Sequence, residues 1–175
     1  ENMTQTSHIK ASKERCLRMR RKILDISQTV PALHIAPAFS CIEIVDTIYF
    51  MLMDQTPNTA NPDTFILSKG HGAMAQYTVL AEMGVLSEKD LNDSGKPGGR
   101  LGMHPDYGLP GIEASTGSLG HGLPMAVGMA LADKVLGVDR TVYVVLSDGE
   151  MQEGSNWESL MLAPTLGLTK IIAYV

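Results

Sequence analysis

The chain has 175 residues, of which 44% are hydrophobic, and its formal net charge is −5. This length allows one domain with a real core, and the negative charge argues against a general nucleic-acid surface. No apolar run is long enough to span a bilayer and no signal-peptide pattern is visible, so we expect no membrane attachment. Cys16 and Cys41 lack metal-ligand spacing, which indicates reduced cysteines of a cytoplasmic protein.

The first half of the chain is predicted to be mainly helical. We expect a frayed, disordered start over residues 1–7, and then an amphipathic helix from Ile9 to about Val30, where basic and apolar residues alternate. The prolines of the segment from Pro31 to Phe39 predict a loop, and a capping box from Ser40 to Glu43 should open the next helix. Further along the chain we expect a linker over residues 55–62, a strand over 64–67, a helix over 73–83, and a short helix starting at 87–90.

The second half predicts a strand–helix–strand unit. Residues 92–111 form a long segment rich in glycine and proline, and such loops are usually functional or disordered. A glycine-rich turn at 115–122 precedes an apolar helix over 123–136, which we expect to be buried all round. The β-branched run at 141–146 is typical of a strand buried on both faces of a parallel sheet. With a helix near 156–166 and a strand at 170–175, the order indicates a single α/β domain over residues 1–175, with a mostly parallel sheet flanked by helices.

Asp148 and Gly149 directly follow the strand predicted at 141–146. Ligands of open parallel sheets bind beyond the carboxyl ends of the strands, and a carboxylate there can share Mg²⁺ with phosphate oxygens. Gly149 would let the backbone approach such a ligand closely. An acidic turn between a strand and a helix explains the same two residues, so both interpretations stay open.

The glycine-rich segment 115–122 reads STGSLGHG. A loop of this kind exposes backbone N–H groups at a helix N-terminus, where the helix dipole favours a phosphate. The segment matches neither the Walker loop nor the dinucleotide fingerprint. A structural glycine turn therefore explains it as well as a phosphate cradle does.

Three histidines, His34, His71 and His104, lie in segments rich in glycine or proline, where functional sites are commonly built. A lone loop histidine is more often a hydrogen-bonded surface residue than a catalytic group, and the histidine spacing does not favour a zinc site. The basic run between Lys10 and Lys22 is interpreted as a solvated helix face in preference to an anion-binding patch.

Four segments together resemble the transketolase family. FILSKGHG at 65–72, GMHP at 102–105, STGSLGHG at 115–122 and SDGEMQEG at 147–154 occur in the order seen in transketolases. The chain is most similar to the N-terminal, diphosphate-binding subunit of split, two-gene transketolases, from about residue 9 to the end. The resemblance implies the thiamine-diphosphate-binding α/β fold.

The resemblance also assigns roles to the histidines. His71 matches a histidine that contacts the cofactor diphosphate and helps proton transfer. His34 and His104 match histidines that bind the sugar hydroxyls and the reacting carbonyl. Ile35 and Ala36 follow His34 where many members of the family have Pro-Gly.

The remaining site residues implied by the resemblance belong to the cofactor. Gly117, Ser118 and Leu119 match the loop whose backbone contacts the diphosphate and the aminopyrimidine. Asp148 matches the metal-ligating aspartate and Gly149 its glycine, while Glu153 matches a glutamate near the cofactor and the subunit interface. The chain departs from the family at Ser118 (often proline), Ser147 (usually glycine) and His121 (often glutamine). The family also continues into an Asp-x-Asn segment with a second metal ligand, so we expect this sequence to be a truncated or partly ordered part of a longer subunit.

The implied activity is transfer of a two-carbon ketol unit from a ketose phosphate to an aldose phosphate. It would use thiamine diphosphate and Mg²⁺, or Ca²⁺ or Mn²⁺ in its place. A C-terminal partner subunit would supply the glutamate that activates the cofactor, and two such pairs would form a heterotetramer. Two alternatives stay open: another thiamine-diphosphate enzyme, acting on modified sugars or resembling 1-deoxyxylulose-phosphate synthase, and a non-catalytic regulatory homologue.

Overall fold

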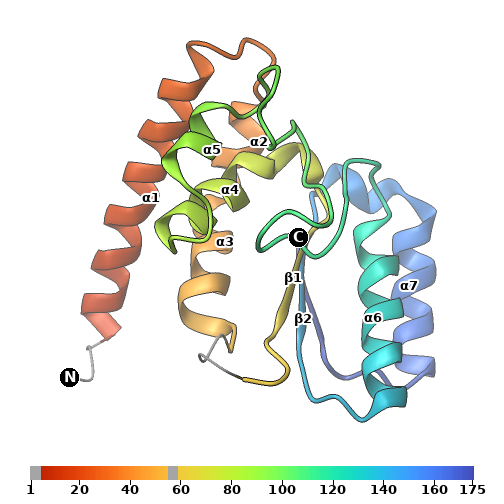
Figure 1. Cartoon of the computed structure of the whole chain (residues 1–175). Coiled ribbons are helices and arrows are strands. Elements are labelled where there is room, and N and C mark those ends of the chain that lie inside the picture. Colours follow the sequence, from red (N-terminus) through yellow and green to blue (C-terminus); the bar gives the residue numbers. More distant parts are fainter. Residues whose placement is uncertain (1–4, 55–58) are drawn as a thin grey trace. The chain divides into compact units, whose positions relative to one another are not determined.

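The computed structural model describes residues 5–54 and 59–175 (Figure 1). The described residues of Glu1–Leu52 and His71–Met103 form one compact unit, called unit 1, and those of Met53–Gly70 and His104–Val175 form unit 2. The expectation of a single domain stays a prediction, and each unit is taken by itself below.

Unit 1 is helical. Four buried residues of its longest helix, Cys16, Met19, Ile23 and Ile26, recur at the spacing of one helix face, and this helix packs mainly against the helices Ile42–Thr47 and Ala73–Glu82. Its elements are α1 (Gln5–Ser27), α2 (Ile35–Phe39), α3 (Ile42–Thr47), the π-helical η1 (Ile48–Leu52), α4 (Ala73–Glu82) and α5 (Glu88–Asn92). A short 3₁₀ turn, η2 (Gly70–Gly72), precedes α4.

Three expectations for unit 1 are wrong in detail. The helix α1 already begins at Gln5, so residues 5–7 are helical, while residues 1–4 lie outside the described residues. The predicted loop contains α2, because Pro37 is only its third residue and proline is tolerated in a first helical turn. Ser40 does not cap α3: it ends α2, its hydroxyl donates to the carbonyl of Pro37, and Cys41 stands at the start of α3 without a side-chain cap. The capping pattern is present at α5, where Ser87 and Asp90 form a complete capping box.

Two ion pairs tie separate segments of unit 1 together. Asp46 is fully buried and accepts hydrogen bonds from the Arg15 guanidinium at 2.7 and 3.1 Å. Asp90 pairs with Arg100 at 2.7 Å, and these hydrogen bonds hold the pKa of the Asp90 carboxyl well below its usual range, with help from Ser87. Between α1 and α3, burial raises the pKa of the Cys16 thiol to about 11, and the charges of Asp46 and Glu43 add to the shift.

Unit 2 contains a parallel sheet in the order β1-β2-β3, formed by β1 (Thr64–Leu67), β2 (Val142–Val145) and β3 (Ile171–Tyr174). Thr64 pairs with Val142, and Val142 with Ile171, so the carboxyl ends of the strands lie at the same edge. All residues of β1 and β2 are buried, as the continuous apolar runs predict for a parallel sheet. The three predicted strands are therefore confirmed.

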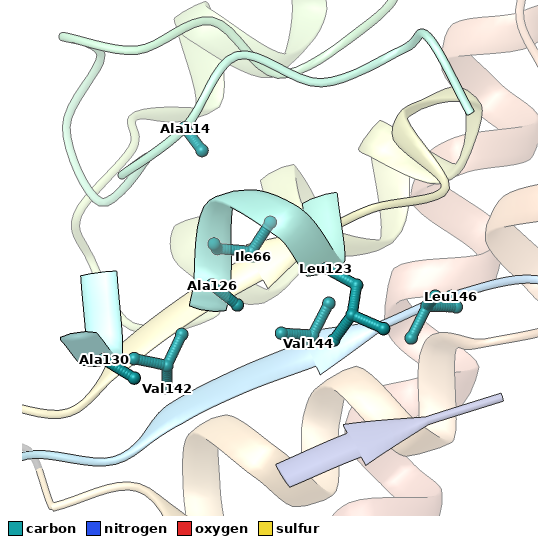
Figure 2. Close-up of a cluster of buried hydrophobic side chains, with 8 residues drawn as sticks. All are labelled: Ile66, Ala114, Leu123, Ala126, Ala130, Val142, Val144 and Leu146. Carbon is teal, nitrogen blue, oxygen red and sulfur yellow. The ribbon is translucent and has the colours of Figure 1, made fainter. Parts of the chain in front are cut away.

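The helix α6 (Gly122–Leu136) packs on this sheet, and α7 (Gly154–Thr165) packs against α6 (Figure 1). Figure 2 shows the resulting core, in which small and branched side chains of α6 meet those of β1 and β2. Its buried members are Ile66, Ala114, Leu123, Ala126, Ala130, Val142, Val144 and Leu146. The predicted burial of the whole helix is wrong, because only one side meets the sheet: Val135 and Leu136 are 77% and 75% exposed.

Across residues 5–54 and 59–175, no helix is both long and apolar enough for a membrane crossing.

Candidate functional site

In unit 2, three loops meet at the carboxyl edge of the sheet, where ligands of such folds bind. Ser68 to Gly70 follow β1, Ser147 and Asp148 follow β2, and the segment 115–122 leads into α6. We call this last segment the glycine loop. The hydroxyl of Thr116 donates to the carbonyl of Leu67 at 2.7 Å, which attaches the start of the loop to the end of β1.

Close packing in and around the glycine loop leaves no room for a side chain at three glycine positions. A Cβ atom built on Gly70 would lie 2.6 Å from the backbone nitrogen of Gly117, and one on Gly122 would overlap the side chain of Ser68. A Cβ atom on Gly120 would lie 2.6 Å from the Cβ of Glu153, and Gly120 also has a φ of +82°. Glycine is therefore required here both by close packing and by left-handed backbone.

The backbone donors of the glycine loop divide into two sets. The N–H of Thr116 donates to the carbonyl of Pro105, and the N–H of Gly120 donates to a glutamate side chain. In the part of the chain that the structure describes, the N–H groups of Gly117, Ser118 and Leu119 have no hydrogen-bond acceptor. Consecutive unpaired N–H groups ahead of a helix form an anion-binding concavity, so the loop can hold a phosphate.

The glutamate that accepts the hydrogen bond from the Gly120 N–H is Glu150, which was not among the predicted site residues. It is fully buried, and its Oε1 accepts hydrogen bonds from the Ser68 hydroxyl at 2.5 Å and from the Gly120 N–H at 2.8 Å. Its Oε2 accepts from the Ser147 N–H at 3.3 Å. Ser68 in turn accepts from the N–H of Gly122 at 3.1 Å, so one carboxylate joins all three loops. Glu150 lies within the segment SDGEMQEG at 147–154, but nothing in that segment assigned it a role.

The predicted metal and cofactor residues after β2 are exposed. Asp148 stands at the start of η3 (Gly149–Gln152), and Glu153 stands at the start of α7, beside Gly120. Among the described residues, no three His, Cys, Asp or Glu side chains gather closely enough to hold a metal ion by themselves. Mg²⁺ is commonly held by one or two carboxylates together with phosphates, so the exposed carboxylate of Asp148 fits a shared metal–diphosphate site.

The predicted histidines fall into both units. In unit 2, His104 is half-buried against the glycine loop: a Cβ atom on Gly117 would lie 3.0 Å from its ring. In unit 1, the rings of His34 and His71 lie 6.3 Å apart between centroids in an edge-to-face arrangement. His34 is exposed at the start of α2, and His71 is half-buried in η2. Each unit thus brings its own predicted residues together.

In the described part of the chain, the carboxyl edge of the parallel sheet carries a glycine loop with unpaired N–H groups and an exposed aspartate. This arrangement is typical of α/β domains that bind phosphate groups. Residues 12–175 match the family described as transketolase, thiamine diphosphate binding domain. The chain belongs to the transketolase family, as the four sequence segments predicted.

Two curated relatives have names that include a sugar. One is a subunit of the apulose-4-phosphate transketolase of Actinobacillus succinogenes, which is 42% identical over 88% of this chain and 58% of the relative. The other is a 6-deoxy-6-sulfo-D-fructose transketolase subunit of a Clostridium species, which is 39% identical over 81% of this chain and 53% of the relative. The chain thus spans a little over half the length of these relatives.

Solved structures agree with the fold. The transketolase from Leishmania mexicana superimposes with a TM-score of 0.85 at 31% identity, covering 93% of this chain and 26% of that one. The transketolase from Campylobacter jejuni gives 0.83 at 28% identity, covering 93% and 28%.

Proposed function

We propose that this chain is the diphosphate-binding part of a transketolase subunit. The proposed reaction moves a two-carbon ketol unit from a ketose phosphate to an aldose phosphate. The observation that supports it most is the row of three unpaired N–H groups at Gly117, Ser118 and Leu119, within the described part of a chain of the transketolase family.

The residues present fit thiamine diphosphate and a divalent cation, with Mg²⁺ first and Ca²⁺ or Mn²⁺ as substitutes. In the proposal, the N–H groups of Gly117, Ser118 and Leu119 bind diphosphate oxygens, and the helix dipole of α6 favours that negative charge. Asp148 holds the cation, Gly149 lets the backbone turn beside it, and Glu153 lies at the edge of the loop. When bound, the cofactor supplies the nucleophilic carbon and the electron sink for breaking a bond beside a carbonyl.

The three histidines are proposed to bind and to move protons. Imidazole changes its charge near neutral pH, so it can exchange a proton with a sugar hydroxyl or a developing alkoxide. We assign His71 to the cofactor side, and His34 and His104 to the sugar hydroxyls and the carbonyl. The pairing of His34 with His71 in unit 1 supports joint action of these two rings.

A second chain is part of the proposal. The chain covers 58% of the Actinobacillus succinogenes relative, whose name marks it as one of several subunits, but 20% of the relative named transketolase 1 from Vibrio cholerae. We therefore propose an N-terminal subunit in the cytoplasm, with a partner subunit that supplies the activating glutamate, and two such pairs in the assembly. Cys16 and Cys41 are buried and form no disulfide bond in the described structure, which agrees with a reducing compartment.

A second candidate function differs only in the sugar. The two relatives named for apulose 4-phosphate and for 6-deoxy-6-sulfo-D-fructose favour a modified sugar as donor. A panel of donors, with xylulose 5-phosphate and fructose 6-phosphate beside branched and sulfonated sugars, would separate the two candidates by kcat/KM.

The cofactor proposal is tested by calorimetric titration of the full-length protein with thiamine diphosphate, with and without Mg²⁺ and the partner subunit. Asp148→Ala should abolish the gain in affinity that Mg²⁺ gives. Asp139→Ala is the matched control, because Asp139 is an exposed aspartate of the same unit whose ion pair with Lys170 lies at the surface. If the wild-type protein binds no cofactor, or if both variants respond to Mg²⁺ alike, the proposal is wrong.

A further inference from the structure

One carboxylate in unit 2 is buried without a cation. Glu150 has no exposed surface, and within the described residues no lysine, arginine or histidine forms an ion pair with it. A carboxylate in such a place is costly unless its oxygens accept several hydrogen bonds. The donors that serve Glu150 come from three separate loops: Ser68 after β1, Ser147 after β2, and Gly120 in the glycine loop.

These hydrogen bonds decide which donors of the glycine loop are left over. Glu150 takes the N–H of Gly120 directly, and it takes the N–H of Gly122 through the hydroxyl of Ser68. The three N–H groups before Gly120 then stand free of protein acceptors in the described structure. An acceptor-only group is needed at this point, since every neighbour that it meets is a donor.

Glu150 also fixes the turn that carries Asp148. Its backbone N–H donates to the hydroxyl of Ser147, while its Oε2 accepts from the N–H of Ser147, so the residues on either side of Asp148 are tied to each other. The Asn156 side chain donates to the carbonyl of Glu150 at 2.7 Å and secures this turn to α7. A single side chain thus links the proposed diphosphate loop with the proposed cation ligand.

We propose that Glu150 is a positioning residue, which holds the glycine loop and the Asp148 turn in register for the cofactor diphosphate without touching it. This inference rests on the proposed function, because the relative position of the glycine loop and the Asp148 turn matters for binding thiamine diphosphate. Its burial keeps the carboxylate itself away from the cofactor. It acts through the free N–H groups of Gly117, Ser118 and Leu119.

The first test needs no cofactor. Hydrogen–deuterium exchange of the full-length wild-type protein is compared with that of Glu150→Ala over a peptide covering residues 115–122. Loss of the acceptor should speed exchange at Gly120 and Gly122 by roughly tenfold or more, while peptides from β2 and from the part of α6 after Gly122 stay unchanged. Glu158→Ala is the matched control, because Glu158 is an exposed glutamate on α7 of the same unit.

The second test uses the enzyme assembled with its partner subunit. Glu150→Ala should raise the apparent KM for thiamine diphosphate by roughly ten- to a hundredfold, and kcat at saturating cofactor should stay within about twofold. A merely structural role would lower the active fraction and hence kcat, and would leave KM unchanged. Glu150→Gln keeps an oxygen for Ser68 and Gly120 but places an NH2 group opposite the N–H of Ser147, so its KM should lie between those of wild type and Glu150→Ala.

Ser68→Ala is a second variant in case Glu150→Ala fails to fold, because it removes the hydroxyl between Gly122 and Glu150 and keeps the carboxylate. Like Glu150→Ala, Ser68→Ala should raise the apparent KM for thiamine diphosphate. A wild-type enzyme that needs no thiamine diphosphate overturns the proposed function and this inference with it. A wild-type enzyme that saturates with the cofactor, next to variants with unchanged KM and unchanged exchange, overturns the inference alone.

Discussion

Replacing Gly70 with alanine should displace the glycine loop by about 0.8 Å, which is the shortfall between a 2.6 Å approach and the 3.4 Å at which ordinary contact begins. The new Cβ would lie 2.6 Å from the nitrogen of Gly117 and 2.7 Å from the carbonyl carbon of Thr116. Both neighbours are backbone atoms, so no flexible side chain can move aside. Relief therefore requires the loop itself to shift.

The size of the effect follows from this overlap. Overpacking of this kind costs about 1–3 kcal/mol, which for a chain of this length lowers the melting temperature by about 2–12 °C. A misplacement near 1 Å can reduce the rate about a hundredfold when it moves groups that hold the reactants. We therefore expect cofactor affinity to fall at least about tenfold in Gly70→Ala, because the N–H of Gly117 moves directly.

Gly128→Ala is the matched control. Gly128 lies inside α6 with nothing within 4 Å of the position of a new Cβ, so alanine there should stabilise the helix by about 1 kcal/mol. Thermal unfolding and titration with thiamine diphosphate would be measured on both full-length variants. A Gly70→Ala protein with the melting temperature and cofactor affinity of wild type would refute the steric argument.

Three further predictions concern unit 1, each read out by urea unfolding. Asp46→Ala should lose about 3 kcal/mol, because it leaves the Arg15 guanidinium without its buried partner; a loss below about 1 kcal/mol would contradict this. Hydrogen bonds from Arg100 lower the pKa of Asp90, so the ionised carboxylate stabilises the folded state above the ordinary aspartate pKa, and this stabilisation is lost as pH falls. The difference in free energy of unfolding between wild type and Asp90→Asn should therefore narrow below about pH 4. The pKa of Cys16 is raised to about 11. The protonated thiol therefore stabilises the folded state fully below about pH 9, and this stabilisation is lost as pH rises from about 9 to 11. In Cys16→Ala the free energy of unfolding should not show this decrease at alkaline pH.

The strands β1 and β2 were predictable to within a residue at either end, because a strand buried on both faces needs a continuous apolar run. The apolar run of β3 was equally visible, although none of its residues is buried in the described structure. The helix starts were less so, and two similar capping patterns show why. Ser87 caps α5 as predicted, whereas the hydroxyl of Ser40 is already bonded to the carbonyl of Pro37. Whether the side chain of a serine can cap a following helix depends on the residues before it. Here those residues form α2, although its proline had predicted a loop.

The candidate site was predictable where local chemistry suffices and not where distant segments meet. Asp148, Glu150 and Glu153 lie within six residues, and the sequence motifs assigned roles to Asp148 and Glu153 but none to Glu150. Burial separates them: Asp148 and Glu153 face solvent, and Glu150 is enclosed by donors from Ser68 and Gly120, which lie 82 and 30 positions away. No periodicity or spacing within the segment encodes those partners. A motif can therefore identify which short segment carries a site, but only the fold decides which carboxylate in it faces a ligand and which one holds the loops that do.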